Sequence, residues 1–191
     1  MKPKIGIDLD QVVCDIQQQM IDIYNQLYPG ENLTKKNWTT YYLRDLTSKE
    51  REDKVLEILA EKRIYRNMEF IPHAKKSLQK LAQSFDLCFV THREWLYEKA
   101  KQDTVYSLTK DEIPYVRIFF TEKKARVAKS EHLKFFIEDN LKNALEISQV
   151  CPCYLFDYPY NREEIEKNSL LIIRGFENQD WWNLFMQILE K

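Results

Sequence analysis

Short apolar runs alternate with stretches of helical periodicity along most of the chain. Six runs are predicted to be strands: residues 4–9, 86–91, 115–120, 133–138, 153–156 and 169–173. Several are apolar nearly throughout, as is typical of strands covered on both faces. Helices are predicted at 94–108, 123–132 and 180–191, and at the stripe Ala74, Leu78, Leu81 and Phe85, with Pro72 in its first turn. This alternation predicts an α/β fold, a parallel sheet flanked by helices.

One long segment interrupts this rhythm. About 75 residues between the first two predicted strands contain no convincing strand, which is too long for a simple crossover. The apolar positions of residues 16–27 fit one helix. Thr47 and Glu50 have the spacing of a capping box before a second helix. We therefore expect a helical insert over residues 16–70, lying above the strand ends, and a core formed by residues 1–15 and 71–191.

Composition narrows the range of functions. Among 191 residues, 29 basic side chains balance 30 acidic ones, so no nucleic-acid polymer is expected as a partner. No apolar run approaches the ~18 residues needed to span a membrane, and no apolar leader is apparent. Only three glycines occur, which excludes a glycine-rich phosphate loop. The four cysteines lack metal-site or redox spacing and are expected to be reduced thiols of a cytoplasmic protein.

The strongest local signal for chemistry is the pair Asp8 and Asp10, directly after the first apolar run. Carboxylates this close repel one another, so they need a cation or a shared proton. A hard divalent ion with oxygen ligands fits this pair, and Mg²⁺ is the ion expected. The alternative is a solvated turn rich in aspartate. In open parallel sheets, however, ligands bind beyond the carboxyl ends of the strands, which favours a site here.

Polar groups follow three other predicted strands. They are Thr91, His92 and Arg93, then Lys123 and Lys124, then Glu138, Asp139 and Asn140. Each set has a plainer interpretation, as helix caps or surface charges. Together they supply a hydroxyl and an arginine to hold an anion, a lysine to neutralise it and a further acid to bind metal. Phosphoryl transfer needs these parts.

With these residues, the chain resembles the haloacid dehalogenase-like phosphatase superfamily. The matching positions are Asp8 and Asp10, Thr91, Lys124, and Glu138 with Asp139. Residues 5–13, 119–124, 136–140 and 155–162 resemble the deoxyribonucleotidase-like branch, that is, the 5′(3′)-nucleotidases and their bacterial relatives. Gln11 and His73 depart from it, since this branch usually has glycine at the first position and a small residue at the second. Lys123 and Lys129 remain alternatives to Lys124.

The resemblance implies a Rossmann-like core with a small helical cap inserted after the first strand. Asp8 would be the nucleophile and Asp10 the acid and base, while Thr91 and Lys124 would hold the phosphoryl oxygens. Mg²⁺ would bind Asp8, the backbone carbonyl of Asp10, and Asp139. The implied activity is a magnesium-dependent phosphomonoesterase that forms an aspartyl-phosphate, with a nucleoside monophosphate as substrate.

Three other functions compete with this one. They are a receiver-type signalling module, a catalytically silent nucleotide-binding relative, and a phosphatase for a sugar phosphate or another small metabolite. For the nucleotide reading, we expect His92 and Arg93 to contact substrate and Trp38, in a predicted loop of the insert, to stack on the base. The sequence leaves the oligomeric state open, with a homodimer as one option.

Overall fold

The computed structural model describes residues 2–162 and 170–190, and its centre is one six-stranded parallel sheet. The strands are β1 Lys4–Ile7, β2 Asp86–Thr91, β3 Arg117–Phe120, β4 Phe136–Glu138, β5 Cys153–Phe156 and β6 Leu171–Ile173. Their order is β3-β2-β1-β4-β5-β6, so the chain builds outward from β1 in one direction and then in the other. The predicted α/β fold is confirmed, and β1 and β4 flank the switch point at which such sheets bind ligands.

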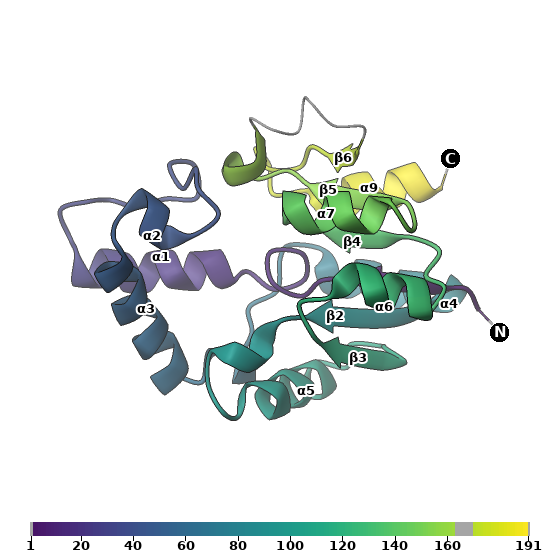
Figure 1. Ribbon diagram of the computed structural model, residues 1–191, viewed down its shortest axis with the longest axis horizontal. Coiled ribbons are helices and arrows are strands. Elements are labelled where there is room, and N and C mark those ends of the chain that lie inside the picture. The colour runs from purple at the N-terminus through teal and green to yellow at the C-terminus, as the bar shows by residue number, and fades with distance from the viewer. Residues whose placement is uncertain (1, 163–169, 191) are drawn as a thin grey trace.

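Helices cover both faces of the sheet (Figure 1). On one face pack α4 Ala74–Ser84, α5 Ala100–Lys110 and α9 Trp181–Leu189; on the other pack α6 Lys124–Ser130 and α7 Leu141–Ser148. The side chains of β2 alternate accordingly, with Phe89 in the first core cluster and Val90 in the second. Because both faces are covered, the strands are apolar nearly throughout, which is the pattern that the sequence shows.

Gly6 of β1 makes room for side chains of the neighbouring strand segment. A Cβ atom at this position would come within 2.2 Å of the Phe136 ring and 2.7 Å of the Leu133 side chain. Any larger residue would push these side chains away from the centre of the sheet. The absence of a side chain at Gly6 therefore leaves room for the Phe136 ring, which packs over β1.

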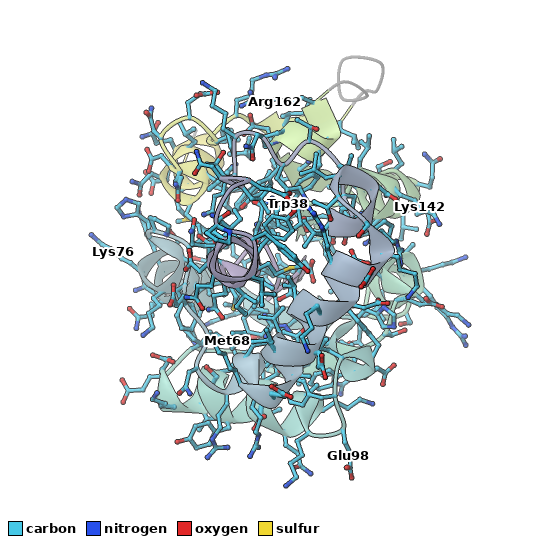
Figure 2. The ribbon with its side chains drawn as sticks, turned by 90° about the vertical axis from the view of Figure 1, so that its left-hand side faces the viewer. Trp38, Met68, Lys76, Glu98, Lys142 and Arg162 are labelled. Atoms are coloured by element: carbon cyan, nitrogen blue, oxygen red, sulfur yellow. The ribbon has the colours of Figure 1, made fainter. Side chains whose placement is uncertain are left out.

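Between β1 and β2, where the sequence predicts a helical insert over residues 16–70, the chain is helical. This segment, called the insert below, contains α1 Ile16–Leu27, α2 Leu43–Leu46, α3 Lys49–Glu61 and the short 3₁₀ helix η1 Ile64–Arg66. Its three α-helices lie to one side of the sheet (Figure 1), and Figure 2 faces them. A separate hydrophobic cluster that includes Tyr24, Trp38, Val55 and Leu59 lies within the insert.

The chain leaves the core and returns to it along two paired segments. The Asp15 amide donates to the Glu69 carbonyl at 2.8 Å, and the Ile71 amide donates to the Val13 carbonyl at 2.9 Å. Cys14 and Phe70 form an antiparallel bridge between these two bonds. The chain therefore enters and leaves the insert through one short, hydrogen-bonded pair of segments.

Some predicted boundaries are wrong. The helix expected over 94–108 is split into a 3₁₀ turn, η2 Arg93–Trp95, and α5, which begins at Ala100. Tyr97 lies in the break, where its ring stacks on Tyr65 at 5.6 Å and its hydroxyl accepts from the Tyr65 amide. These contacts with the insert hold the intervening residues out of a continuous helix.

Two predicted helix starts shift by a residue or two. Ser48, and not Thr47, caps α3 by accepting from the Arg51 amide at 3.3 Å. Pro72 precedes α4 instead of lying in its first turn, because His73 adopts a left-handed conformation and ends the approach to the helix. The last predicted strand and helix extend to Ser169 and Lys191, which lie outside the described residues.

The four cysteines, Cys14, Cys88, Cys151 and Cys153, are buried free thiols, as expected. Within residues 2–162 and 170–190, the structure shows no helix long and apolar enough to cross a membrane.

Candidate active site

The candidate nucleophile and its partner lie in a tight loop that follows β1. Asp8 directly follows the strand, and its amide donates to the Ile137 carbonyl of β4 at 3.0 Å. Beyond Asp10, the Tyr158 hydroxyl donates to the Gln11 carbonyl and the Trp182 indole donates to the Val12 carbonyl, both at 2.8 Å. These buried donors come from the last part of the chain and hold the loop against the sheet edge.

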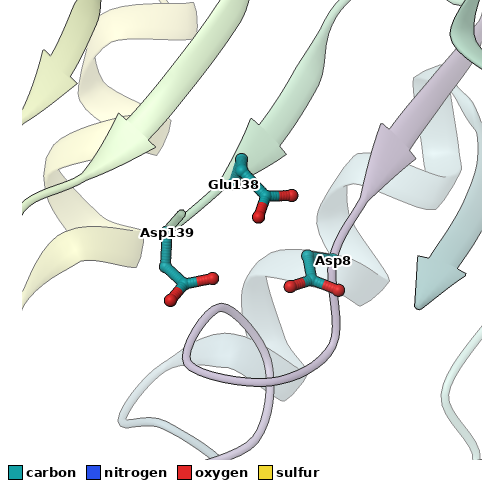
Figure 3. A group of neighbouring side chains, drawn as sticks. All are labelled: Asp8, Glu138 and Asp139. Atoms are coloured by element: carbon teal, nitrogen blue, oxygen red, sulfur yellow. The ribbon is translucent and has the colours of Figure 1, made fainter. Parts of the chain in front are cut away.

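Three carboxylates converge at the switch point. Asp8, Glu138 and Asp139 are buried, and one oxygen from each lies within 4.8 Å of the others. Figure 3 shows the side chains approaching one another from the ends of β1 and β4. The alternative interpretation of this segment, a helix cap, is also correct in part, because Asn140 caps α7 by accepting from the Asn143 amide. That cap uses Asn140 and leaves Asp139 free to face the site.

Lys124, the first residue of α6, neutralises part of this charge. Its ammonium nitrogen lies 2.9 Å from Asp8 Oδ2 and 2.9 Å from Glu138 Oε2. Lys123 and Lys129 are exposed, so of the three lysines that the sequence left open, the structure brings Lys124 to the acids. Glu138 also accepts from the Asn140 amide and the Asn143 side chain, so its oxygens are committed within the protein.

The electrostatics of the cluster show a deficit of positive charge. Burial raises the pKa of Asp8 to about 7; Lys124 opposes the rise, and Glu138 and Asp10 add to it. Burial also raises the pKa of Asp139 well above its usual value, with Glu138 and Asp8 adding to the effect. One lysine does not compensate the charge of three buried acids. A bound cation would lower the cost of keeping these carboxylates ionised.

The donor set fits a hard divalent cation. Asp139 is held by the Tyr160 hydroxyl, which donates to Oδ2 at 2.6 Å, and by Asn161, which donates to its carbonyl at 2.8 Å. In the described contacts, its Oδ1 accepts no hydrogen bond, so this oxygen is available beside Asp8. Oxygen ligands of this kind suit Mg²⁺. Tyr160 would orient Asp139 by holding its other carboxylate oxygen, and no pattern in the sequence pointed to that role.

Thr91 lies at the carboxyl end of β2, beside β1. It is buried, and its hydroxyl has no hydrogen-bond partner among the described residues. A buried hydroxyl without a partner is costly, and an anion at this sheet edge could accept its hydrogen bond. The neighbouring His92 is exposed, and its side chain makes no hydrogen bond within the described part of the chain.

The expectation that Arg93 contacts substrate is wrong for this structure. Its side chain is 0% exposed, and its guanidinium binds both oxygens of Asp10. Because β1 and β2 are parallel neighbours in register, residues just beyond their ends meet, and Arg93 meets Asp10. Arg93 is therefore buried and binds the carboxylate of Asp10, not a substrate.

The expected base-stacking role of Trp38 also disagrees with the structure. Trp38 lies in a loop, as predicted, but it is 3% exposed within the hydrophobic cluster of the insert (Figure 2). Three residues further on, Tyr41 is 46% exposed and lies edge-on to Tyr160, with ring centroids 5.7 Å apart. The Tyr160 hydroxyl in turn donates to Asp139, so the Tyr41 ring lies one side chain away from the acids.

The fold is that of the haloacid dehalogenase-like hydrolases. A haloacid dehalogenase-like protein of unknown function from Agrobacterium tumefaciens superposes with a TM-score of 0.67 at 12% identity, covering 99% of this chain and 100% of that one. The chain belongs to the family described as 5′ nucleotidase, deoxy (Pyrimidine), cytosolic type C protein, whose model matches residues 2–170.

Two curated relatives come from Clostridium acetobutylicum. A nucleotidase is 30% identical over 98% of this chain and 95% of its own length. A 5′(3′)-deoxyribonucleotidase is 26% identical over 85% of this chain and 86% of its own length. The chain is accordingly a phosphoric monoester hydrolase and not a receiver-type module.

Proposed function

We propose that this protein is a Mg²⁺-dependent phosphatase for nucleoside monophosphates that works through an aspartyl-phosphate on Asp8. The observation that carries the proposal is the buried Asp8–Lys124–Glu138 arrangement at the switch point of the sheet. Lys124 fixes the carboxylate of Asp8 and offers a positive charge where a phosphoryl group would arrive. Thr91, whose buried hydroxyl has no hydrogen-bond partner among the described residues, is the second donor to that group.

In the first step, a carboxylate oxygen of Asp8 forms a bond to phosphorus while the ester oxygen leaves. Asp10, two residues further along, gives its proton to that departing oxygen, so the leaving group departs as a neutral alcohol. Lys124 and Thr91 stabilise the negative charge on the remaining phosphoryl oxygens.

In the second step, water attacks the phosphorus and the bond to Asp8 breaks. Asp10, now a carboxylate, takes the proton from that water, which restores both residues and releases inorganic phosphate. One side chain thus acts first as an acid and then as a base. The side chain of Asp10 is 33% exposed, so it can reach both the leaving oxygen and water.

Asp8, the Asp10 carbonyl and Asp139 would hold the Mg²⁺. When bound, this ion lowers the repulsion between the acids and the incoming phosphate. Glu138 is excluded from this set because its oxygens already accept from Lys124, Asn140 and Asn143. Its role is to orient Lys124.

The helical insert would act as a cap that covers the substrate and excludes water. Tyr41 contributes a half-exposed ring near the acids, and it meets Tyr160, which itself stacks on Tyr158 with ring centroids 5.1 Å apart. Aromatic rings bind planar bases by stacking. Tyr41 therefore replaces Trp38 as the proposed base contact. The four buried thiols support the further proposal that the protein works in the reducing cytoplasm.

Steady-state kinetics over nucleoside monophosphates, sugar phosphates and 4-nitrophenyl phosphate test this proposal. We expect a nucleotide to have the highest kcat/KM. Replacing Tyr41 by Ala should raise KM for that nucleotide, by about 10-fold if stacking contributes its usual 1–3 kcal/mol, with a much smaller change for 4-nitrophenyl phosphate.

Tyr106→Ala is the matched control, because Tyr106 is 44% exposed and packs against Arg66, which pairs with Asp103 of α5. It should leave both KM values unchanged. A sugar phosphate as the preferred substrate would contradict the nucleotide assignment and leave the phosphatase chemistry standing.

A further inference from the structure

The strongest interaction of Asp10 is with an arginine that no step above requires. Arg93 Nε lies 3.0 and 3.1 Å from the two Asp10 oxygens, and Nη2 lies 2.7 Å from Oδ1. Such a two-pronged contact fixes the plane of a carboxylate as well as its place, because the guanidinium is flat and rigid. The orientation of Asp10 is therefore determined by Arg93.

Arg93 is held in turn by residues that return from the insert. Its guanidinium carbon lies 4.5 Å from the centre of the Tyr65 ring, and Nη1 contacts Met68 Sδ. Tyr65 belongs to η1, and Met68 lies between η1 and the paired segment at Glu69 and Phe70. We call residues 63–71, which lead from the insert back to the core, the return segment. The arginine thus bridges this return segment and the loop of the core that carries Asp10.

The two sides of this contact differ in exposure. The Arg93 side chain is fully buried, whereas the Asp10 side chain is partly open on the side that Arg93 does not cover. Arg93 therefore cannot touch a substrate without leaving its place, but it can aim the open side of Asp10. Its only charged contact among the described residues is Asp10.

We propose that Arg93 is a positioning residue for proton transfer by Asp10, and that Tyr65 ties this positioning to the return segment of the insert. The inference rests on the proposed function, since it concerns the acid and base of that reaction. It predicts that loss of Arg93 harms proton donation to the leaving group and spares the attack by Asp8.

Leaving-group dependence tests the proposal directly. An alkyl phosphate such as a nucleoside 5′-monophosphate needs a proton on its leaving oxygen, whereas 4-nitrophenyl phosphate releases a weakly basic phenolate that does not. We expect Arg93→Met to lower kcat/KM for the nucleotide by about 10- to 100-fold, within the range of general acid catalysis, with a loss below about 3-fold for 4-nitrophenyl phosphate.

A double-mutant cycle separates positioning from a general structural effect. If Arg93 acts through Asp10, adding Arg93→Met to Asp10→Asn should cause no further loss for the nucleotide. Losses that multiply, or equal losses for the two substrates in the single variant, would overturn the proposal. If wild type hydrolyses neither substrate, the proposed function fails as well, so the two failures are distinguishable.

Two further variants keep the test decisive should Arg93→Met fold poorly. Tyr65→Leu removes the ring under the guanidinium but keeps Arg93, and it should shift the ratio of the two kcat/KM values in the same direction. Arg66→Met is the control: Arg66 lies in the same 3₁₀ helix and also packs on a tyrosine, but it pairs with Asp103 and not with Asp10. It should leave the ratio unchanged. An unchanged ratio in Tyr65→Leu would overturn the link to the insert.

Discussion

At the scale of single residues, the α6 lysines show how position determines chemical role. Lys124 is buried between Asp8 and Glu138, while Lys129, five residues further along the same helix, is exposed. Replacing Lys124 by Met should lower kcat/KM by roughly 100-fold or more, the loss typical of removing a group that stabilises transition-state charge. Lys129→Met should be neutral. Steady-state kinetics of the two variants check the assignment, and similar losses would contradict it.

The sequence could predict positions that need an unusual backbone, but not how the protein tolerates a side chain there. Gln11 and His73 stand where the related branch favours glycine or a small residue, and both have positive φ angles, 57° and 66°. Gln11 compensates for this strain through a pair of hydrogen bonds with Gln17. The His73 imidazole contacts Asp180 at 3.7 Å. The residue type alone could not show these compensating contacts.

Aromatic residues show a second limit of prediction from sequence. Trp38 and Tyr41 lie in the same loop, and the polar neighbours of Trp38 indicated exposure. The insert needs large apolar groups for its own small core, and Trp38 supplies one beside Leu43 and Val55. Which aromatic ring fills that core depends on tertiary packing, and a local sequence pattern carries no information about it.

At the scale of elements, Asp103 joins α5 to the 3₁₀ helix of the return segment. Its carboxylate accepts from Arg63 at 2.5 and 2.8 Å and from Arg66 at 3.3 Å. Burial by itself would raise the pKa of Asp103, but these hydrogen bonds outweigh it, and the pKa lies below its usual value. The contact thus stabilises the folded state only while Asp103 is ionised.

The pH dependence follows from that direction. The contacts of Asp103 stabilise the folded state fully above the pKa of Asp in the unfolded chain, about 3.9. This stabilisation is lost as the pH falls through the lower pKa of Asp103 in the folded state. Asp103→Asn should lower the free energy of unfolding by roughly 1–3 kcal/mol at pH 6, and by less near pH 3. Urea denaturation at the two pH values measures this difference.

Asp53→Asn is the control for this measurement, since Asp53 forms an exposed pair with Lys49. Its effect should stay below about 1 kcal/mol at both pH values, as is usual for surface pairs. A loss for Asp103→Asn that is equal at pH 6 and pH 3 would show that charge plays no part.

Elements were predicted best where packing and local pattern agree. All six strands lie within or close to their predicted runs, because burial on both faces leaves a continuous apolar signal. The helix expected over 94–108 failed because its first residues are held by Tyr65, whose partner Tyr97 is distant in sequence. Most of the candidate site could be predicted from the sequence, because four strand ends meet at one edge of the sheet. The contact between Asp10 and Arg93 was not predicted.

At the scale of the whole molecule, hydrophobic clusters fill both faces of the sheet, so we expect the fold to survive the loss of bound metal. Removing divalent ions with a chelator should abolish activity and leave the circular dichroism spectrum of the folded protein intact. Adding Mg²⁺ should restore activity and raise Tm, because an ion that binds only the folded state stabilises it, by about 2.7 kcal/mol at 100-fold excess over Kd.

Asp139→Asn should remove most of the Mg²⁺-dependent rise in Tm, since this variant takes away one of the proposed ligands while keeping the size of the side chain. Ca²⁺ in the same assay serves as a comparison, since it shares oxygen ligands but prefers a looser geometry. Full activity after exhaustive chelation, or an equal rise in Tm in the variant, would contradict the metal assignment.

The central claim is that phosphate passes through Asp8, and trapping the phosphoenzyme tests it most directly. The enzyme is mixed with substrate and Mg²⁺, quenched in acid during steady-state turnover and reduced with borohydride, which converts an aspartyl-phosphate to homoserine. Peptide mass spectrometry should then find homoserine at position 8 and none in Asp8→Asn, which should also lack turnover. Turnover without homoserine at position 8, or homoserine at Asp10 or Asp139 instead, would contradict the account.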